Sequence, residues 1–122
     1  LMQQKKALAN LATLLRDGSP QVTPVWFDYT NGRVRVNTAK GRVKARTLRE
    51  GVPVAMSILD PDNPYRYLQI RGTVVRATEE GASAHIDSLA KKYLGQDKYP
   101  FAQPGEVRIM YEIEPQATQA MG

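Results

Sequence analysis

Alternation of apolar and polar residues along the chain predicts a mainly β protein. Leu8 to Leu15 is almost continuously apolar, as in a buried strand, and the run from Gln21 to Tyr29 is rich in β-branched and aromatic residues. Asn31-Gly32 favours a tight hairpin turn, because both central residues of a type I′ turn must tolerate positive φ. That turn leads into a further predicted strand over Arg33–Asn37, in which Arg and Val alternate.

The second half of the chain carries further strand patterns. Val54, Met56 and Ile58 fall on one face of a predicted strand over Val52–Leu59. A long strand is predicted over Tyr65–Ala77, and Gly72 within it indicates a β-bulge or a close approach by another backbone.

Proline and turn-forming residues mark the ends of these strands. Asp60–Pro64 contains two prolines beside Asp and Asn and is predicted to be a loop. The last strand is predicted over Val107–Ile113, because Pro115 should stop it. Residues 116–122 are expected to form a flexible C-terminal tail.

One segment has the pattern of an amphipathic helix. Thr78 is the predicted N-cap, Glu79 and Glu80 fill the first turn, and Gly95 ends the helix. The residues Ala82, Ile86, Leu89 and Tyr93 recur at helical spacing on one stripe.

About six strands joined by early hairpins, without regular βαβ alternation, predict an antiparallel closed or split β-barrel. We expect two or three flanking helices outside it. With 122 residues, the chain is long enough for one core, so we assign a single domain over 1–115 followed by the tail.

Basic residues concentrate in one run, because seven of the 17 lysines and arginines lie between Arg33 and Arg49. Thr38 is a possible N-cap for a helix that would begin with Lys40, Arg42 and Lys44. Cations are unfavourable beside the positive end of a helix dipole, so this arrangement suits a bound phosphate or another anion. A solvated basic face explains the run about equally well.

Composition narrows the possible chemistry. The net charge of +5 favours anionic partners such as a phosphorylated cofactor, nucleic acid or a membrane surface. Without cysteine there are no disulfides, which is compatible with the cytoplasm, and no apolar run reaches the ~20 residues of a membrane span. The single histidine, His85, fits a structural role on the helix face better than catalysis. Asp60 and Asp62 fit a solvated turn, so no metal site and no hydrolytic site is predicted.

Aromatic and small polar residues leave two kinds of ligand open. Trp26, Phe27 and Tyr29 on one strand could stack nucleic-acid bases or a ring cofactor, although core packing explains any single ring. Small polar residues beside the basic run favour a compact ligand that carries a phosphate; they are Gln21, Thr23, Asn37 and Thr38.

Several stretches together resemble the pyridoxamine-5′-phosphate-oxidase-like split-barrel superfamily, and most of all its PPOX-class F420-dependent oxidoreductases (flavin/deazaflavin oxidoreductases of the B type). The resemblance covers nearly the whole chain. The stretches that carry it are Leu11–Leu14, Asp17–Trp26, Asn37–Arg46, Leu59–Tyr67 and Ala84–Asp87.

The resemblance implies a six-stranded split barrel that forms a homodimer, with two cofactors in grooves between the subunits. Arg42 and Lys44, with Lys40 nearby, would hold the cofactor phosphate. The strand with Gln21, Thr23 and Pro24 would line the ring and the ribityl chain, with Asn37 and Thr38 beside it. The partner subunit would contribute Asn63, Pro64, Tyr65 and Arg66. The candidates for contacts with the anionic tail of coenzyme F420 are Arg46, Arg49 and Arg66.

The function implied by the resemblance is hydride transfer between reduced deazaflavin and an electron-poor, small organic substrate. We assign no catalytic acid or base, because the cofactor carries the redox chemistry. The alternatives are an FMN-binding flavoprotein, a non-catalytic cofactor carrier and a nucleic-acid-binding basic barrel, the last of which we do not expect.

Overall fold

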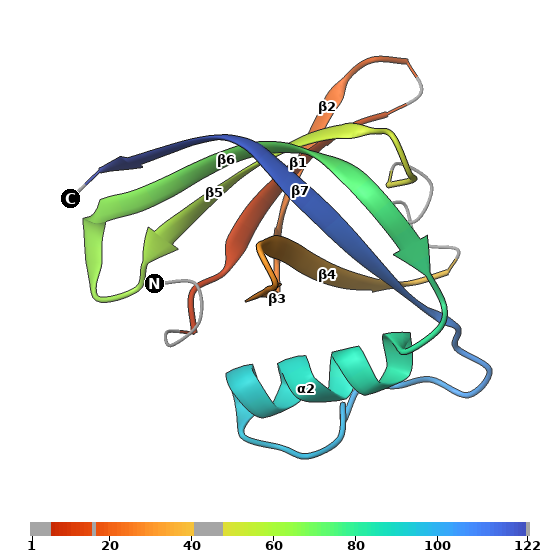
Figure 1. Ribbon diagram of the computed structural model, residues 1–122. Coiled ribbons are helices and arrows are strands. Elements are labelled where there is room, and N and C mark those ends of the chain that lie inside the picture. Colours follow the sequence, from red (N-terminus) through yellow and green to blue (C-terminus); the bar gives the residue numbers. More distant parts are fainter. Residues whose placement is uncertain (1–5, 16, 41–47, 122) are drawn as a thin grey trace.

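Seven strands form a single antiparallel sheet in the computed structural model, which describes residues 6–15, 17–40 and 48–121. The order across the sheet is β2-β1-β5-β6-β7-β4-β3, and the sheet curls into a half-barrel (Figure 1). This confirms the predicted split-barrel class, with one strand more than expected. The strands are β1 (Ala9–Leu14), β2 (Pro20–Val25), β3 (Phe27–Thr30), β4 (Arg33–Ala39), β5 (Pro53–Asp60), β6 (Asn63–Thr78) and β7 (Arg108–Met121).

The extra strand comes from a division of the predicted strand over Gln21–Tyr29. The chain breaks at Trp26, so that β2 pairs with β1 while β3 pairs with β4 at the other end of the sheet. The prediction of one strand was wrong because β propensity reports an extended backbone and not the neighbour with which it pairs. The Asn31-Gly32 turn is confirmed, with φ values of 53° and 77°.

The hydrophobic core fills the inside of the curl. Val54, Met56 and Ile58 point inward from β5, as their alternation predicted. Phe27 and Tyr111 are almost fully buried in the same core. Each strand therefore has an inner face in the core and an outer face that is covered or exposed according to its position in the sheet.

The β5–β6 connection is tighter than predicted. Asp60 and Asn63 pair across the hairpin, which leaves Pro61 and Asp62 as the turn. Asp60 is buried, accepts a hydrogen bond from the Asp62 amide and lies 3.4 Å from the Arg66 guanidinium. The expectation of a solvated Asp60 was therefore wrong, because its carboxylate organises the turn.

Strand β7 continues past Pro115 to Met121, so the predicted stop was wrong, and residues 116–121 form strand where a flexible tail was expected. Pro115 lies opposite Gly72 at the irregularity between Arg71 and Gly72, a position that tolerates a missing N–H. The bulge predicted at Gly72 is thus confirmed. It lets β6 and β7 pair along most of their length.

Helix α2 (Ala82–Leu94) covers the outer face of β4 and β7 (Figure 1). Its C-terminal cap at Gly95 and its buried stripe match the prediction. Its N-cap is Gly81, with φ of 75°, whereas Thr78 ends β6 and accepts a hydrogen bond from the Glu80 amide. The predicted start at Thr78 was three residues early because the chain must first turn away from β6.

The other predicted helix start is corrected in part. Thr38 lies within β4 and is buried, so it is a strand residue and not an N-cap. Residues 41–47, which carry the rest of that predicted helix, lie outside the described residues. In the part of the chain that the structure describes, α2 is the one helix.

Replacement of Gly72 by Ala tests the bulge. A Cβ at Gly72 would overlap the backbone carbonyl oxygen of Glu114, so Gly72→Ala should lower the free energy of unfolding by roughly 2–3 kcal/mol. Gly105→Ala is the control, since a Cβ there meets open space and only the positive φ opposes it, at roughly 1–2 kcal/mol. Equal losses in urea denaturation would contradict the overlap.

Candidate functional site

The predicted ligand residues on β2 divide between the two faces of the strand. Gln21 and Thr23 pair with Thr13 and Leu11 of β1 and face the barrel interior, whereas Pro24 is exposed on the outer face. The Gln21 side-chain oxygen Oε1 is buried and has no hydrogen-bond partner among the described residues. A buried acceptor that receives no hydrogen bond destabilises the folded state, so the Gln21 oxygen should accept a hydrogen bond from a group other than the described residues.

The predicted residues at the end of β4 also point to different sides. Thr38 is on the inner face, and Asn37 points to the outer face towards α2. Lys40 follows the strand; its amide donates to the Val107 carbonyl at 2.7 Å, and its Nζ lies 3.6 Å from a Glu79 carboxylate oxygen. Arg42 and Lys44 lie outside the described residues.

The third group of predicted residues is in the β5–β6 hairpin. Asn63 accepts a hydrogen bond from the Tyr65 amide, and Tyr65 is 83% exposed. Pro64 belongs to the same strand, β6. This hairpin lies at the end of the barrel opposite the start of β2 and the end of β4 (Figure 1). A single chain therefore does not bring the two halves of the predicted site together.

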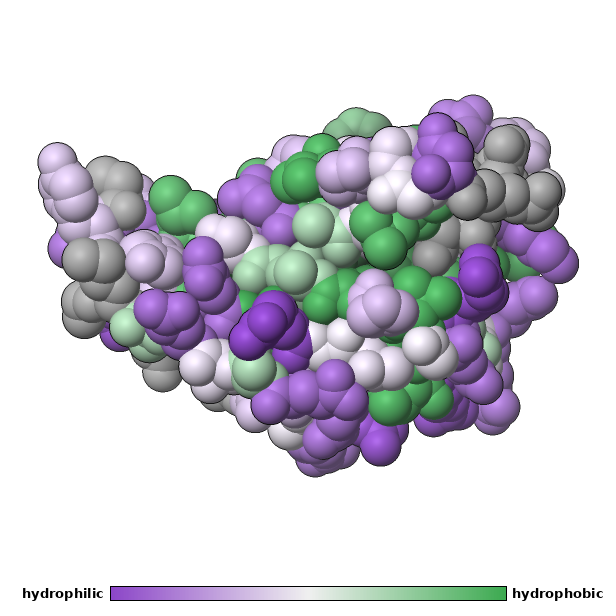
Figure 2. Space-filling model, turned by 90° about the horizontal axis from the view of Figure 1, so that it is seen from above, coloured by the Kyte–Doolittle hydropathy of each residue, from purple (hydrophilic) through white to green (hydrophobic). Residues whose placement is uncertain are grey.

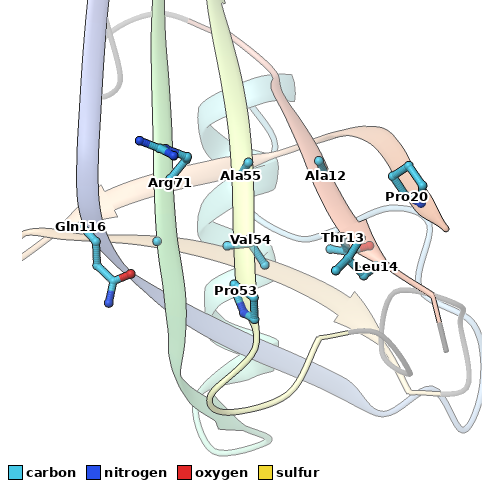
Figure 3. A pocket seen from close by; sticks show the side chains of 10 residues that line it. Ala12, Thr13, Leu14, Pro20, Pro53, Val54, Ala55, Arg71 and Gln116 are labelled. Carbon is cyan, nitrogen blue, oxygen red and sulfur yellow. The ribbon is translucent and has the colours of Figure 1, made fainter. Parts of the chain in front are cut away.

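An apolar groove runs over the outer face of β1, β5 and β6. It consists of two adjoining depressions of about 330 Å³ each, both lined by Ala12, Ala55 and Arg71. The alanines pair across the strands, and their small side chains leave the face hollow beside Arg71 (Figure 3). Apolar residues gather in the middle of this face (Figure 2), and Leu14 and Val22 are exposed at its border. We call this surface the outer groove.

A polar network joins the barrel to α2 on the outer face of β3 and β4. Arg35 Nε and Nη2 donate to the two carboxylate oxygens of Asp28 at 2.7 and 2.8 Å. His85 Nε2, from α2, lies 3.0 Å from Asp28 Oδ2. The His85 side chain is 1% exposed, so the helix-face histidine has the structural position that its neighbours in the sequence indicated.

Asn37 is the centre of the same network. Its Nδ2 donates to the Ala82 carbonyl at 2.9 Å and lies 3.0 Å from His85 Nδ1, while its Oδ1 accepts from Arg108 Nε at 2.8 Å. Arg108 in turn donates to Glu106 at 3.0 Å. A ligand contact by Asn37 would use its backbone or displace one of these bonds. Sequence reasoning missed the network because its hydrogen-bonded pairs lie up to 71 positions apart.

The network changes the acidity of Asp28. Burial raises the pKa of Asp28, but the hydrogen bonds from His85 and Arg35 outweigh burial and lower it to about 2. Asp28 therefore remains a carboxylate throughout the neutral range and anchors both β4 and α2.

Neither a metal site nor a membrane-spanning helix is found among the described residues. No group of three or more His, Cys, Asp or Glu side chains there has the arrangement of a metal site. No helix there has the length and apolar character needed to cross a membrane.

Residues 3–122 match the family model described as pyridoxamine 5′-phosphate oxidase. The chain belongs to this family. The curated proteins contain no match to it. Among solved structures, an F420 reductase is 31% identical, with 97% of this chain and 93% of that chain covered and a TM-score of 0.81.

Solved structures of lower sequence identity share the fold of this chain. A conserved hypothetical protein from Mycobacterium tuberculosis is 22% identical, with a TM-score of 0.74 over 97% of this chain and 78% of that one. HutZ, a heme storage protein from Vibrio cholerae, is 16% identical, with a TM-score of 0.64 over 98% and 89%. The split barrel thus recurs in proteins with different ligands.

The lowered pKa of Asp28 predicts the acid stability of the protein. The carboxylate has a pKa of about 2 when folded against 3.8 ordinarily, so it contributes stability above pH 3.8 that is lost as the pH falls towards 2. Asp28→Asn should lower the free energy of unfolding by roughly 2 kcal/mol at pH 7, and the difference should vanish near pH 2.

Urea denaturation from pH 2 to pH 7 measures this difference. Asp97→Asn is the control, because that exposed carboxylate pairs with the exposed Lys91 and should leave the pH profile unchanged. A constant offset between Asp28→Asn and the wild type at all pH values would contradict the assignment.

Proposed function

We propose that this protein is a coenzyme F420-dependent oxidoreductase that transfers a hydride between reduced deazaflavin and an electron-poor organic substrate. The observation that carries the proposal is the 31% identity with an F420 reductase over 97% of this chain, at a TM-score of 0.81. Membership of the pyridoxamine 5′-phosphate oxidase family supports an oxidoreductase with a ring cofactor that bears a phosphate.

The residues present fit such a cofactor. The buried Gln21 oxygen needs a hydrogen-bond donor, and an N–H or O–H group of a polar ring system or ribityl chain would satisfy it. Thr23 lies on the same face of β2, two residues along. Lys40, Arg42 and Lys44 supply positive charge after the end of β4, which suits a phosphate.

The chain's part in the reaction is to bind and orient. When bound, the deazaflavin would supply the hydride. Gln21, Thr23 and Thr38, on the inner faces of β2 and β4, would hold the ring and ribityl side, and the cations after β4 would hold the phosphate. Pro24 faces the other side of β2 and is not part of this contact. Asn37, which is engaged with α2, would position the end of β4 and not donate to the ligand.

Two copies of the chain would complete each site. The β5–β6 hairpin lies at the opposite end of the barrel from the start of β2 and the end of β4 (Figure 1). Its residues Asn63, Pro64, Tyr65 and Arg66 would therefore serve the site of a partner subunit. The outer groove offers an apolar surface for that partner, with Leu14 and Val22 exposed beside it. A two-fold axis would produce two equivalent sites.

The cations after β4 test cofactor binding. Arg42→Ala combined with Lys44→Ala should abolish binding of coenzyme F420, measured by fluorescence titration, because two charge-assisted contacts to phosphate are removed. Lys91→Ala combined with Lys98→Ala removes the same charge from exposed positions and should bind as the wild type does. Unchanged affinity in the first variant would overturn the phosphate assignment. Tight binding of FMN in place of F420 would favour the flavoprotein alternative.

Mixed dimers test the shared site. Arg42→Ala with Lys44→Ala damages one half of each site, and Tyr65→Ala with Arg66→Gln damages the other half. If each site combines the halves of different subunits, a mixed dimer keeps one intact site of two. Equal mixing after unfolding and refolding should therefore restore about a quarter of the wild-type binding capacity. No recovery above that of either variant alone would mean that each chain forms its own site.

A further inference from the structure

We propose that His85 is a positioning residue that works as a proton-controlled latch. In its neutral form it holds Asn37 and thereby fixes the end of β4 against α2, and a proton on Nδ1 releases Asn37. The latch itself follows from the hydrogen-bond geometry. Its effect on ligand binding rests on the proposed function, because β4 leads into the segment that would hold the cofactor phosphate.

The orientation of the Asn37 amide follows from two neighbours whose roles are invariant. Arg108 Nε can only donate, so the Asn37 atom 2.8 Å from it must be the oxygen. The Ala82 carbonyl can only accept, so the Asn37 atom 2.9 Å from it must be the nitrogen. Rotation of the amide by 180° would place donor against donor and acceptor against acceptor.

This orientation determines the tautomer of His85. Asn37 Nδ2, an obligatory donor, lies 3.0 Å from His85 Nδ1, which must therefore accept. The ring hydrogen is then on Nε2, which donates to Asp28 Oδ2 at 3.0 Å. Hydrogen bonds consequently run in one direction, from Arg108 through Asn37 and His85 to Asp28.

The hydrogen bonds around His85 do not accommodate a second proton on its ring. It would place an N–H on Nδ1 directly against the Asn37 N–H at a heavy-atom separation of 3.0 Å. Asn37 cannot turn its oxygen to the ring without losing Arg108 and Ala82. With the His85 side chain 1% exposed, water cannot take over either contact without movement of α2.

Charged groups from every neighbouring element act on the ring. From β3, the Asp28 carboxylate favours the protonated ring, whereas Arg35 on β4 and Arg108 on β7 oppose it. Glu106 offsets the charge of Arg108 at 3.0 Å. On α2 itself, Lys92 lies near Asp28 and donates to the Phe27 carbonyl at 2.8 Å. Asp28 thus favours protonation of the ring, and Asn37 is the group that must move when Nδ1 is protonated.

The release of Asn37 would reach the proposed site directly. Three residues further on, the Lys40 amide donates to the Val107 carbonyl, and Val107 precedes Arg108. The Asn37 side chain therefore binds Arg108, the β7 residue that pairs with Ala39 at the end of β4. We expect the affinity for coenzyme F420 to fall roughly tenfold as His85 becomes protonated, the effect of losing about one hydrogen bond of the network.

Nuclear magnetic resonance of the ¹⁵N-labelled full chain tests the latch without any cofactor. His85 is the one histidine of the sequence, so its imidazole signals need no assignment. The spectrum above the titration midpoint should show the Nε2–H tautomer, and a side-chain amide signal of Asn37 should shift with the same midpoint. An Nδ1–H tautomer, or an Asn37 amide that ignores the titration, would overturn the proposal.

Asn37→Asp provides the decisive variant, because a carboxylate oxygen can accept from a protonated Nδ1. The new carboxylate would stabilise the protonated ring, so the His85 titration midpoint should rise. Asn31→Asp adds the same charge at the exposed hairpin turn and should shift the midpoint much less. A midpoint that does not rise more in Asn37→Asp than in the control would overturn the latch. If Asn37→Asp does not fold, the tautomer of His85 measured in the wild type still tests the latch.

His85→Gln separates the latch from the proposed function. Its side chain can still donate to Asp28 but does not titrate near neutral pH, so its affinity for coenzyme F420 should be independent of pH between 5 and 8. A pH dependence that persists unchanged in this variant would refute control by His85. Failure of the wild type to bind F420 at any pH would refute the function and leave the tautomer measurement valid.

Discussion

The passage of the chain through Trp26 is the constraint on which the rest of the structure depends. Strands β2 and β3 end the sheet on opposite sides, yet one residue joins them, so the sheet must curl until its two ends meet. Trp26 stacks on Tyr93 of α2 with 5.2 Å between ring centroids. The Tyr93 hydroxyl donates to the Ala7 carbonyl at 2.6 Å. The residue at which the barrel closes is therefore also a residue on which the helix packs.

Closure also explains why polar residues can be buried beneath α2. Asp28 and Arg35 pair across β3 and β4 on the outer face, which would be a solvated surface in an open sheet. The helix covers that surface and supplies His85 and the Ala82 carbonyl, so each buried group in the network has a partner. Buried polar groups that are fully paired make one arrangement of helix and barrel strongly preferred.

The same architecture separates the two halves of the predicted site. Gln21, at the start of β2, and Tyr65, in the β5–β6 hairpin, lie at opposite ends of the same sheet. A small movement of either segment would not bring them together. The proposed assembly of two copies would convert this separation into two equivalent sites, and the apolar outer groove would provide the surface between them. Asn37, predicted as a ligand residue, binds the Ala82 carbonyl and Arg108 through its side chain in the structure.

Local patterns in the sequence were sufficient to predict those elements that a few adjacent residues determine. The inner face of β5, the Asn31-Gly32 turn, the Gly72 bulge and the Gly95 cap each depend on a few adjacent residues. The sequence also determined the fold class and the family. Only the tertiary structure divided the strand at Trp26, carried β7 past Pro115 and turned Asn37 towards α2. Each of these depends on a neighbour distant along the chain, which local propensity and alternation do not encode.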